Sequence, residues 1–334
     1  MSAGSILVTG AGGFIGYNLS NYLVRQGWNV QGVDLHYPEN PGPGRAARFC
    51  AVRADFRDAT AMQPLLRSTD VLVHLAGAHL QQAADESEYW DINVRSVPVL
   101  LDAARRAGVR RVVHVSSVGI YGRLETCPAD EQTPCRPQSI YGRTKWEGEQ
   151  AALEFARLHA YPVIVLRPAW VYGPGCPRTL KIFRTLRKKR FPMIGHGKNL
   201  RHPVFIDDFV RACEIACGNG AGEGQAFVIA GERAMTSGQL IEAFCSALAV
   251  PRPWLRVPYP AARMLATGAE TMCGWIGREP PISRRTLEFF DTDNAFDIAK
   301  ARRELGFHPQ VDLERGLKET RPWLESTLGN GNRE

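Results

Sequence analysis

Short apolar runs alternate with amphipathic stretches through the first half of this chain. Runs that indicate strands lie at 6–9, 30–34, 50–54, 71–75, 112–116 and 163–166. Between them, apolar residues recur at helical spacing over 15–26, 59–66, 89–107 and 141–159. Strands that alternate with helices build parallel sheets with helices on both faces. The pattern therefore predicts an α/β fold around a doubly wound parallel sheet, whose ligands bind at the carboxyl ends of the strands.

The regular alternation ends near residue 168, where proline and glycine become frequent. A chain of 334 residues is long enough for one large α/β domain and a smaller one. We therefore expect a cofactor-binding domain over 1–168, to which the stretch 204–230 returns. The remaining segments, 169–203 and 231–330, are expected to form a smaller C-terminal substrate-binding domain.

The connection between the first strand and the first helix is rich in glycine. It reads TGAGGFIG over 9–16, and the glycines at 10, 13 and 16 give the spacing G-x-x-G-x-x-G. Glycine lets backbone N–H groups approach a phosphate, and a helix start favours negative charge, so the turn predicts a pyrophosphate seat in a Rossmann-like fold. Asp34 ends the next apolar run, where a carboxylate accepts from ribose hydroxyls. Since that charge would repel a 2′-phosphate, we expect NAD rather than NADP.

A second group of polar residues predicts proton transfer. Tyr141 and Lys145 lie four positions apart in a helical stretch, so both stand on one face of it. The unperturbed pKa of a tyrosine phenol is about 10. A neighbouring ammonium group and a nicotinamide cation favour the phenolate and lower that pKa, so Tyr141 is suited to exchange the proton of a substrate hydroxyl. Ser117 follows a predicted strand and is expected to hydrogen-bond the substrate oxygen.

Composition and charge narrow the range of partners. The net charge is +7, and seven basic residues crowd the segment 178–190. We interpret this segment as a solvated helix face or as a surface that attracts an anionic partner. No nucleic-acid-binding motif accompanies it, so nucleic acid is not expected as a partner. No apolar stretch reaches the length of a membrane span.

Cysteine usage and the first residues bear on the compartment. The eight cysteines are scattered and include no C-x-x-C pair, so they predict free thiols rather than a metal site. Residues 1–4 run directly into the first predicted strand and lack the basic and apolar regions of a signal peptide. We therefore expect a cytoplasmic enzyme that binds no metal.

These motifs together resemble the extended short-chain dehydrogenase/reductase superfamily, the branch of NAD-dependent epimerases and dehydratases. The resemblance covers nearly the whole chain. Besides the glycine turn and Asp34 it rests on ADFRD at 54–58, HLAGA at 74–78, Asn93, VSSVGIYG at 115–122, YGRTK at 141–145, LRPAWVYGPG at 166–175, FIDD at 205–208 and ARRELGFHP at 301–309. It implies the fold predicted above and an NAD-dependent oxidoreductase that acts on a secondary alcohol of a small molecule.

The resemblance also assigns individual residues. Ser117, Tyr141 and Lys145 match the catalytic residues, and in that family the lysine also holds the nicotinamide ribose. Asn93 matches a residue that fixes local helix geometry. The cofactor site is matched by Gly10, Gly13, Phe14, Ile15 and Gly16 in the phosphate turn, Asp34 at the adenosine ribose, Asp55 and Phe56 at the adenine, and Ala76 and Gly77 along the cofactor.

Two positions bear on the branch within the family. Sugar 4,6-dehydratases carry an Asp-Glu pair directly after the catalytic hydroxyl, where this chain has Val118 and Gly119, so a 4,6-dehydratase is disfavoured. Arg201 matches an arginine that binds the sugar-nucleotide diphosphate in epimerases, and the basic segment 178–190 would also suit an anionic substrate.

Other residues favour an apolar substrate. Trp170 stands where nucleotide-sugar enzymes often place an asparagine that contacts substrate. With the Gly-Pro-Gly turn at 173–175, it resembles the 3β-hydroxysteroid dehydrogenases and dihydroflavonol reductases. Trp254, Trp275 and the apolar residues over 255–276 are interpreted as the lining of an apolar pocket or as packing residues.

Three functions therefore stay open. The first is a nucleotide-sugar epimerase, in which a ring hydroxyl is oxidised and the ketone is reduced on its other face. The second is a dehydrogenase of the 3β-hydroxysteroid type that oxidises an apolar alcohol once. The third is a silent dinucleotide-binding scaffold, against which the intact Ser117, Tyr141 and Lys145 argue. The resemblance further implies a homodimer, formed through the helices at 89–107 and 141–159.

Overall fold

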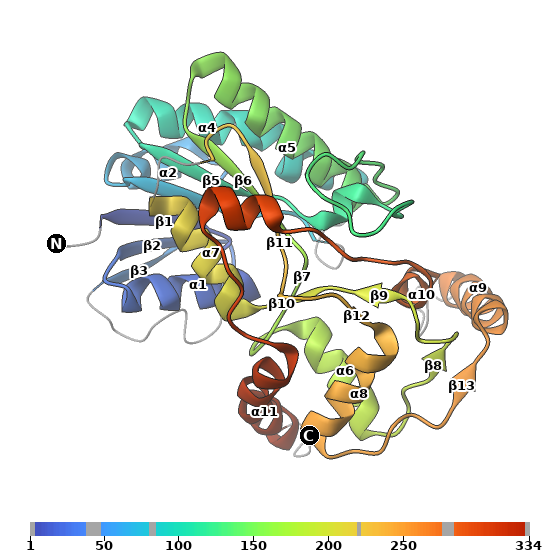
Figure 1. The fold of residues 1–334 in the computed structure, drawn as a ribbon. Helices are drawn as coiled ribbons and strands as arrows, with labels where there is room; N and C mark the ends of the chain where they lie inside the picture. Colours follow the sequence, from blue (N-terminus) through green and yellow to red (C-terminus); the bar gives the residue numbers. More distant parts are fainter. Residues whose placement is uncertain (1–3, 38–47, 80–84, 219–221, 276–283, 331–334) are drawn as a thin grey trace.

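Seven parallel strands form the sheet that the alternating pattern predicts. The computed structural model describes residues 4–37, 48–79, 85–218, 222–275 and 284–330. The strand order is β11-β6-β5-β4-β1-β2-β3, and each neighbouring pair is parallel (Figure 1). The strands are β1 (Ser5–Thr9), β2 (Asn29–Asp34), β3 (Phe49–Arg53), β4 (Val71–His74), β5 (Arg111–Val115), β6 (Val163–Pro168) and β11 (Ala226–Ile229).

Helices cover both faces of this sheet, which confirms the doubly wound fold. Side chains alternate along each strand, so Leu7 and Leu72 pack under α2 (Ala59–Arg67), α4 (Ser96–Ala107) and α5 (Ile140–His159). Ile6 and Val8 point to the opposite face and pack under α1 (Phe14–Arg25) and α7 (Ile206–Gly218). The carboxyl ends of β1, β2, β4 and β5 therefore meet at one edge, where the predicted site residues lie.

The helix expected over 89–107 is interrupted. It consists of α3 (Glu86–Trp90), a π-helical turn η1 (Asp91–Arg95) and α4. The carbonyl of Asn93 in η1 lies against Gly148 of α5, where any Cβ would overlap its oxygen. A side-chain pattern cannot reveal such a turn, because the cause is close backbone packing against another helix.

The stretch 204–230 contributes one strand to the main sheet. β10 (Pro203–Phe205) pairs instead with β7 (Trp170–Tyr172), and α7 then crosses a face of the sheet. β11 follows and pairs with β6 as the edge strand.

A smaller lobe holds most of the remaining chain (Figure 1). Its short strands pair two by two, β9 (Leu200–Arg201) with β12 (Met235–Thr236) and β8 (Met193–Ile194) with β13 (Arg256–Val257). Phe183 and Phe244 of this lobe belong to the same apolar cluster as Ile6 and Val8 of the sheet, so one core joins the two lobes. Its helices are α6 (Pro177–Arg187), α8 (Ser237–Leu248), α9 (Tyr259–Trp275), α10 (Arg284–Asp291) and α11 (Leu313–Asn330). Among the described residues, no helix has the length and apolar character needed to cross a membrane.

Candidate active site

The glycine turn after β1 leaves no room for side chains. Gly10 has a φ of 74°, in the left-handed region, and a Cβ there would lie 2.8 Å from the backbone nitrogen of Ala76. At Gly12 and Gly16 a Cβ would overlap the backbone oxygens of His36 and Gly10. The turn thus forms a cradle of bare backbone, which fits the close approach of a pyrophosphate.

The start of α1 completes this cradle. Gly13 begins the helix without a side-chain hydrogen bond to its first turn. The first N–H groups of a helix have no partner within it, and they carry the positive end of the helix dipole. Phe14 and Ile15 follow in that first turn. The arrangement is suited to an anion, and contact of these residues with NAD stays a prediction.

Asp34 stands beside the turn at the end of β2. Its Oδ2 accepts a hydrogen bond from the Gly12 N–H at 2.9 Å, and its Oδ1 accepts from the His36 N–H at 3.0 Å. A carboxylate has about four acceptor sites, so Asp34 keeps acceptor sites for further donors, and its contact with a ribose stays a prediction.

Asp55 and Phe56 follow β3 on the same side of the sheet. The guanidinium of Arg57 donates to Asp55 at 2.6 Å, and these hydrogen bonds lower the pKa of that carboxyl group. The ring of Phe56 packs 5.0 Å from that of His74, measured between centroids. A carboxylate whose charge is balanced by Arg57 and the face of an aromatic ring are therefore available to the predicted adenine.

The loop after β4 is held from both sides. On one side, the Ala76 N–H donates to Thr9 Oγ1 at 3.2 Å, and that hydroxyl lies 2.8 Å from His74 Nδ1. The hydroxyl has one donor and two acceptor sites, so the tautomer of His74 decides which of the two groups donates. The end of β1 thus fixes the backbone on which Ala76 and Gly77 sit.

On the other side, Asn93 joins this loop to α5. Its Oδ1 accepts from the Ala78 N–H at 2.8 Å, and its Nδ2 donates to Thr144 Oγ1 at 3.0 Å. A Cβ at Gly77 would lie 3.0 Å from that Oδ1 and 3.9 Å from Lys145 Nζ. Asn93 therefore positions the loop against the helix that carries Tyr141 and Lys145.

The first turns of α5 place those two side chains. Ser139 caps the helix, because its Oγ accepts from the Gly142 N–H at 3.0 Å. Lys145 is buried one turn beyond Tyr141, and its Nζ donates to the Val115 carbonyl at the end of β5, at 2.6 Å. Burial lowers the pKa of Lys145 to about 8, against a smaller raising effect of the Glu149 carboxylate.

Ser117 and Tyr141 face each other across Gly119. A Cβ at Gly119 would lie 3.3 Å from Ser117 Oγ and 3.6 Å from Tyr141 Cε1. Ser117 Oγ accepts from the Gly119 N–H at 3.0 Å, which orients the hydroxyl at the start of a short 3₁₀ turn. The fold thus brings Ser117, Tyr141 and Lys145 together beside the cofactor cradle.

Trp170 and Arg201, both predicted to contact substrate, lie in one aromatic group with Arg178. Trp170 opens β7, and its ring packs between Phe244 and Phe289, at centroid distances of 6.2 Å and 6.1 Å. The guanidinium carbon of Arg178, in the first turn of α6, lies 5.8 Å from the Trp170 ring centroid. The guanidinium carbon of Arg201 lies 4.6 Å from the centroid of Phe289, so both guanidinium groups lie beside the same aromatic group.

Arg201 is itself turned inward. Its guanidinium donates to the backbone oxygens of Leu200 at 3.1 Å and Thr292 at 2.9 Å, and to that of Phe289. Burial, together with the nearby Arg178, lowers its pKa to about 10. Its predicted contact with a diphosphate stays a prediction, and in this structure Arg178 is the more exposed of the two.

Three site residues were not predicted from the sequence. Gly12 belongs to the glycine-rich turn, but only the position of the His36 carbonyl shows that a side chain does not fit there. The ring of His79 meets that of Tyr141 edge-on, at a centroid distance of 5.5 Å. From the sequence, Arg178 was identified only as one of the basic residues of the segment 178–190. Neither contact leaves a trace in the local sequence, because each depends on packing between distant segments.

The apolar residues beyond Trp254 do not gather around this site. Trp254 is 82% exposed, and Met264 is 77% exposed on α9. Residue 276 and the side chain of Trp275 lie outside the described part of the structure.

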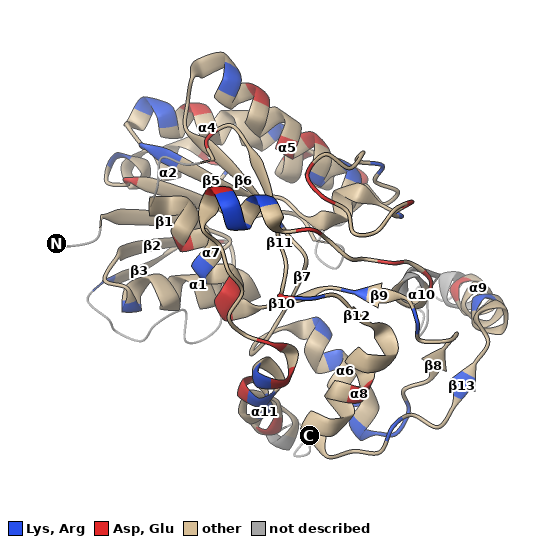
Figure 2. Cartoon of the chain, in the orientation of Figure 1, with Lys and Arg blue, Asp and Glu red and all other residues tan. Residues whose placement is uncertain are grey.

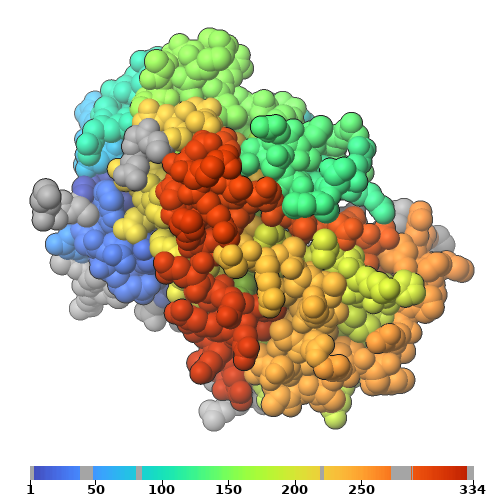
Figure 3. Space-filling view, in the orientation of Figure 1, coloured from blue at the N-terminus to red at the C-terminus, as the bar shows by residue number. Residues whose placement is uncertain are grey.

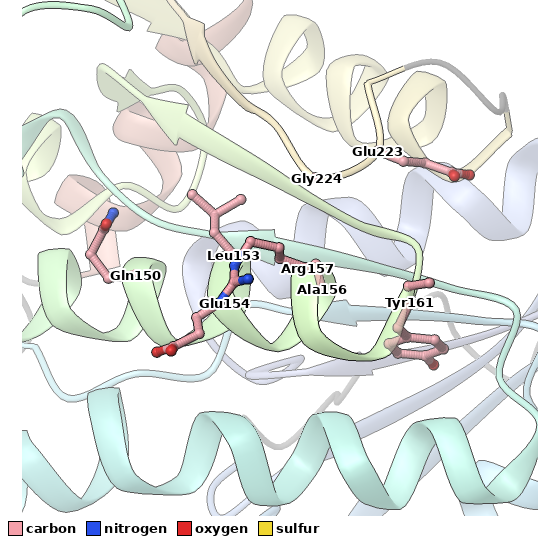
Figure 4. A pocket seen from close by; sticks show the side chains of 9 residues that line it. Gln150, Leu153, Glu154, Ala156, Arg157, Tyr161, Glu223 and Gly224 are labelled. Atoms are coloured by element: carbon pink, nitrogen blue, oxygen red, sulfur yellow. The ribbon is translucent and has the colours of Figure 1, made fainter.

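A separate hollow of about 810 Å³ lies along the second half of α5 (Figure 4). Glu154, Arg157 and Tyr161 line it, together with Glu223 before β11. Arg157 lies sixteen positions after Tyr141 in the same helix, which corresponds to about 24 Å at 1.5 Å per residue. This hollow is therefore distinct from the site around Tyr141.

Comparison with known proteins agrees with this geometry. Residues 6–230 match the NAD dependent epimerase/dehydratase family. A UDP-glucose 4-epimerase of Mycolicibacterium smegmatis is 32% identical over 85% of this chain and 97% of its own length. A dTDP-glucose 4,6-dehydratase of Streptomyces griseus is 31% identical over 95% of this chain and 93% of its own. The crystal structure of a dTDP-glucose 4,6-dehydratase from Streptomyces venezuelae, with NAD bound, superimposes with a TM-score of 0.79 at 27% identity, covering 97% and 98% of the two chains.

Proposed function

This chain belongs to the NAD dependent epimerase/dehydratase family, and from that membership we propose that it is a nucleotide-sugar epimerase. The observation that carries the proposal is the grouping of Ser117, Tyr141 and Lys145 next to the glycine cradle. Gly10, Gly12, Gly16 and Asp34 would hold NAD, which when bound accepts a hydride from a carbinol carbon and returns it.

Each of the three residues then has one task. Tyr141, as phenolate, takes the proton of a ring hydroxyl and later gives it back. The ammonium of Lys145 favours that phenolate through its charge. Ser117 donates a hydrogen bond to the reacting oxygen and stabilises the charge that develops on it.

The substrate class follows from the charges near Trp170. Arg178 and Arg201 bring two cations to one place at the edge of the aromatic group. A diphosphate would relieve their mutual repulsion, and guanidinium groups bind phosphate oxygens bidentately. A nucleoside diphosphate sugar supplies such a group at a fixed distance from the sugar hydroxyls.

We propose further that the enzyme does not carry out 4,6-dehydration. That reaction needs an acid and a base beside the reacting sugar, and Val118 and Gly119 provide neither. A side chain at 119 would stand between Ser117 and Tyr141, beside the hydroxyl that these two residues are proposed to bind. Product analysis by NMR is expected to show an epimer and no 4-keto-6-deoxy sugar, whereas formation of that keto sugar would contradict this point.

A second candidate function rests on the aromatic group. Trp170 and Phe289, with Phe244 buried behind Trp170, present rings where an apolar alcohol of the 3β-hydroxysteroid type would lie, and the guanidinium of Arg201 is engaged with backbone oxygens. Such a dehydrogenase would accumulate reduced cofactor in proportion to the alcohol consumed. An epimerase shows no net redox change.

The decisive experiment compares substrates and variants of the full-length protein. UDP-glucose and dTDP-glucose are each incubated with the protein and NAD, and a 3β-hydroxysteroid serves as the apolar alternative. We expect epimerisation of a sugar nucleotide, and loss of turnover by about a hundredfold or more in Tyr141→Phe. Survival of turnover in Tyr141→Phe would show that another group is the base. Formation of reduced cofactor with the steroid alone would favour the second function.

The role of Arg178 has its own test. Arg178→Ala is expected to raise the KM for the sugar nucleotide by about tenfold while kcat changes little, because a charge-assisted hydrogen bond to phosphate is lost. Arg184→Ala, one and a half turns later on the same helix, is the matched control. Equal KM values for both variants would contradict the assignment.

We propose a homodimer formed through α4 and α5. Each helix exposes an apolar residue, Val99 at 57% and Leu158 at 61%. Paired helices from two copies would bury both residues in an isologous contact.

A further inference from the structure

We propose that the smaller lobe binds the surface of an anionic phospholipid membrane. The contact would be made by a surface named here the basic–apolar rim. It consists of the exposed cations of α6 other than Arg178, of those in the tract that follows this helix, and of the exposed apolar residues of 254–265. This binding is independent of the proposed epimerase function, since no residue of the catalytic group takes part.

The outer face of α6 is strongly basic. Thr179, Phe183 and Leu186 form the buried face of this helix. The opposite face borders a hollow of about 470 Å³, lined by four cations with Leu180 and Pro177, and these cations are Lys181, Arg184, Lys188 and Arg190. Several cations around one hollow offer charge-assisted hydrogen bonds to a phosphate headgroup.

The basic tract lies directly beside exposed apolar residues. β8 and β13 run parallel with Met193 opposite Arg256, and the Met193 N–H donates to the Leu255 carbonyl at 2.9 Å. This pairing brings the residues that directly follow the basic tract next to Leu255, which is 44% exposed, and to Trp254 before it, which is 82% exposed.

α9 continues the apolar part of the rim. Its buried face, Ala262 and Ala266, packs on Ile194 of β8. Its outer side carries Met264, 77% exposed, and Leu265, 64% exposed. The space-filling view shows the segments around 190–200 and 250–270 adjoining on one face of the lobe (Figure 3).

Charge along the rim has one sign. The segment 177–200 contains eight Lys and Arg residues and the segment 249–269 contains three, and neither contains Asp or Glu. Figure 2 shows this basic colouring on α6, on the tract that follows and on β13. Arg252 forms an ion pair with Glu242 of α8. The rim thus carries an excess of positive charge, which attracts an anionic surface over about a Debye length.

The exposed apolar residues of the rim favour a membrane over a nucleic acid as the anionic partner. Exposed Trp, Leu and Met side chains gain free energy when they enter the boundary between headgroups and acyl chains, and adjacent cations add attraction to anionic lipids. A nucleic acid would satisfy the cations and leave Leu255, Met264 and Leu265 in water. The combination of both residue classes on one surface is typical of interfacial binding.

The rim is also joined to the substrate side of the site. Phe191 lies at its edge and contacts Phe290 at a ring-centroid distance of 6.1 Å. Phe290 contacts Phe289 at 5.0 Å, and Phe289 contacts Trp170 at 6.1 Å. Binding through the rim would therefore bring the substrate side of the site close to the membrane surface.

The test measures sedimentation of the full-length protein with lipid vesicles. Vesicles of phosphatidylcholine alone are compared with vesicles that also contain phosphatidylglycerol. We expect binding to the anionic vesicles only, and weaker binding as salt is added. Removing three cations in Lys188→Gln/Lys189→Gln/Arg190→Gln is expected to lower the affinity by about a hundredfold, at about fivefold per cation.

A matched control removes the same charge elsewhere. Arg315→Gln/Lys318→Gln/Arg321→Gln neutralises three exposed cations of α11 and is expected to bind vesicles like the wild type. Trp254→Ser/Leu255→Ser is expected to weaken binding severalfold with all cations in place. Trp254→Phe is expected to lose most of the fluorescence quenching by brominated lipids. Unchanged thermal midpoints and NAD affinities exclude misfolding of these variants.

Three results would overturn the proposal. One is the absence of binding to anionic vesicles at low salt. Another is an equal loss of binding in the α6 and α11 charge variants, which would indicate an effect of net charge alone. The third is tighter binding to duplex DNA or RNA than to vesicles with no effect of Trp254→Ser/Leu255→Ser, which would identify a nucleic-acid surface instead.

Discussion

The buried ammonium group of Lys145 lies near two histidines. His74 and His114 are buried beside it, with ring centroids 5.4 Å apart. Burial, and then the charge of Lys145, lowers the pKa of His74 to about 3 and that of His114 well below its usual value. Both histidines are therefore neutral at physiological pH, and the ammonium is the one cation among the three groups.

The lowered pKa of Lys145 makes stability depend on pH. It lies at about 8 in the folded chain and at 10.5 in the unfolded chain, so unfolding takes up a proton between these values. The free energy of unfolding therefore decreases as pH falls from 10.5 to 8, by on the order of 3 kcal/mol from this group. As pH falls from 10.5 to 8, Lys145→Met is expected to lose less stability than the wild type, measured by urea unfolding without NAD. Parallel pH profiles of the two proteins would contradict the assignment.

His114 gives a prediction of the same direction at lower pH. Within the described part of the chain, neither of its ring nitrogens has a hydrogen-bond partner. Its pKa is lower when folded than the unfolded value of 6.5, so stability is lost as pH falls below 6.5. His114→Phe keeps an aromatic ring without the proton site. Its thermal midpoint is expected to decline less than that of the wild type between neutral and acid pH.

The same substitution at exposed His196 is the control for His114→Phe. It is expected to leave the acid branch of the stability profile as in the wild type. If His114→Phe loses stability as steeply as the wild type does, proton uptake at His114 is not the cause.

The residues that the sequence places most directly are those fixed by local structure. Tyr141 and Lys145 share a helix that begins at a serine cap, so their spacing puts them on one face. Ser117 follows a strand whose carboxyl end points to the same crevice. His79 and Arg178 reach their partners across the fold. A single sequence holds no sign of such contacts, because they depend on how distant elements pack.

At the scale of elements, the glycine turn gives the sharpest test of the cofactor site. The Gly12 N–H donates to the Asp34 carboxylate, and a Cβ at this position would overlap the His36 carbonyl. Gly12→Ala is expected to weaken NAD binding by about ten- to a hundredfold, as a charge-assisted hydrogen bond and the turn geometry are lost. Isothermal titration with NAD measures this change.

Gly268→Ala is the matched glycine-to-alanine control. Nothing lies within 4 Å of a Cβ at Gly268, in the interior of α9. NAD affinity is expected to stay unchanged, and the protein to gain about 0.5–1 kcal/mol of stability from the better helix former. Equal NAD affinities of Gly12→Ala and the wild type would show that the turn tolerates a side chain.

Element types were more predictable than their interruptions. The six strands expected in the first half of the chain all occur, because each is a short apolar run between polar turns. The π turn at Asn93 was hidden inside a continuous helical pattern, and it is this turn that carries the Asn93 side chain to Ala78 and Thr144. The stretch 204–230 was expected to return to the first domain, but β11 was not predicted as a strand within it. Only its pairing with β6 identifies it as an edge strand.

At the scale of the whole molecule, the two lobes are joined through one core and across the cofactor cradle. Asn18 of α1 donates to the Pro174 carbonyl in the loop after β7, at 3.3 Å. That loop leads directly into α6 and Arg178. The helix that follows the glycine turn and the segment that carries Arg178 are therefore held by a direct contact between the lobes as well as by shared packing.

The proposed dimer gives a prediction at the same scale. Leu158→Glu and Val99→Glu would each place charges at the centre of the α4–α5 contact, where unpaired charges are costly. Light scattering is expected to show a dimer for the wild type and a monomer for either variant. Met264→Glu, which changes a still more exposed apolar residue on α9, is expected to leave the mass unchanged. A monomeric wild type, or the same mass for all four proteins, would rule out this interface.

The central claim is that Tyr141 moves a proton while the substrate carbon loses its hydrogen to NAD. It is tested most directly by stopped-flow absorbance of reduced nicotinamide, after mixing the NAD-loaded protein with a sugar nucleotide that carries deuterium on the reacting carbon. We predict a transient reduction that deuterium slows in the wild type, and no transient in Tyr141→Phe at any pH at which that variant is folded. A transient of equal rate and size in Tyr141→Phe would contradict the account.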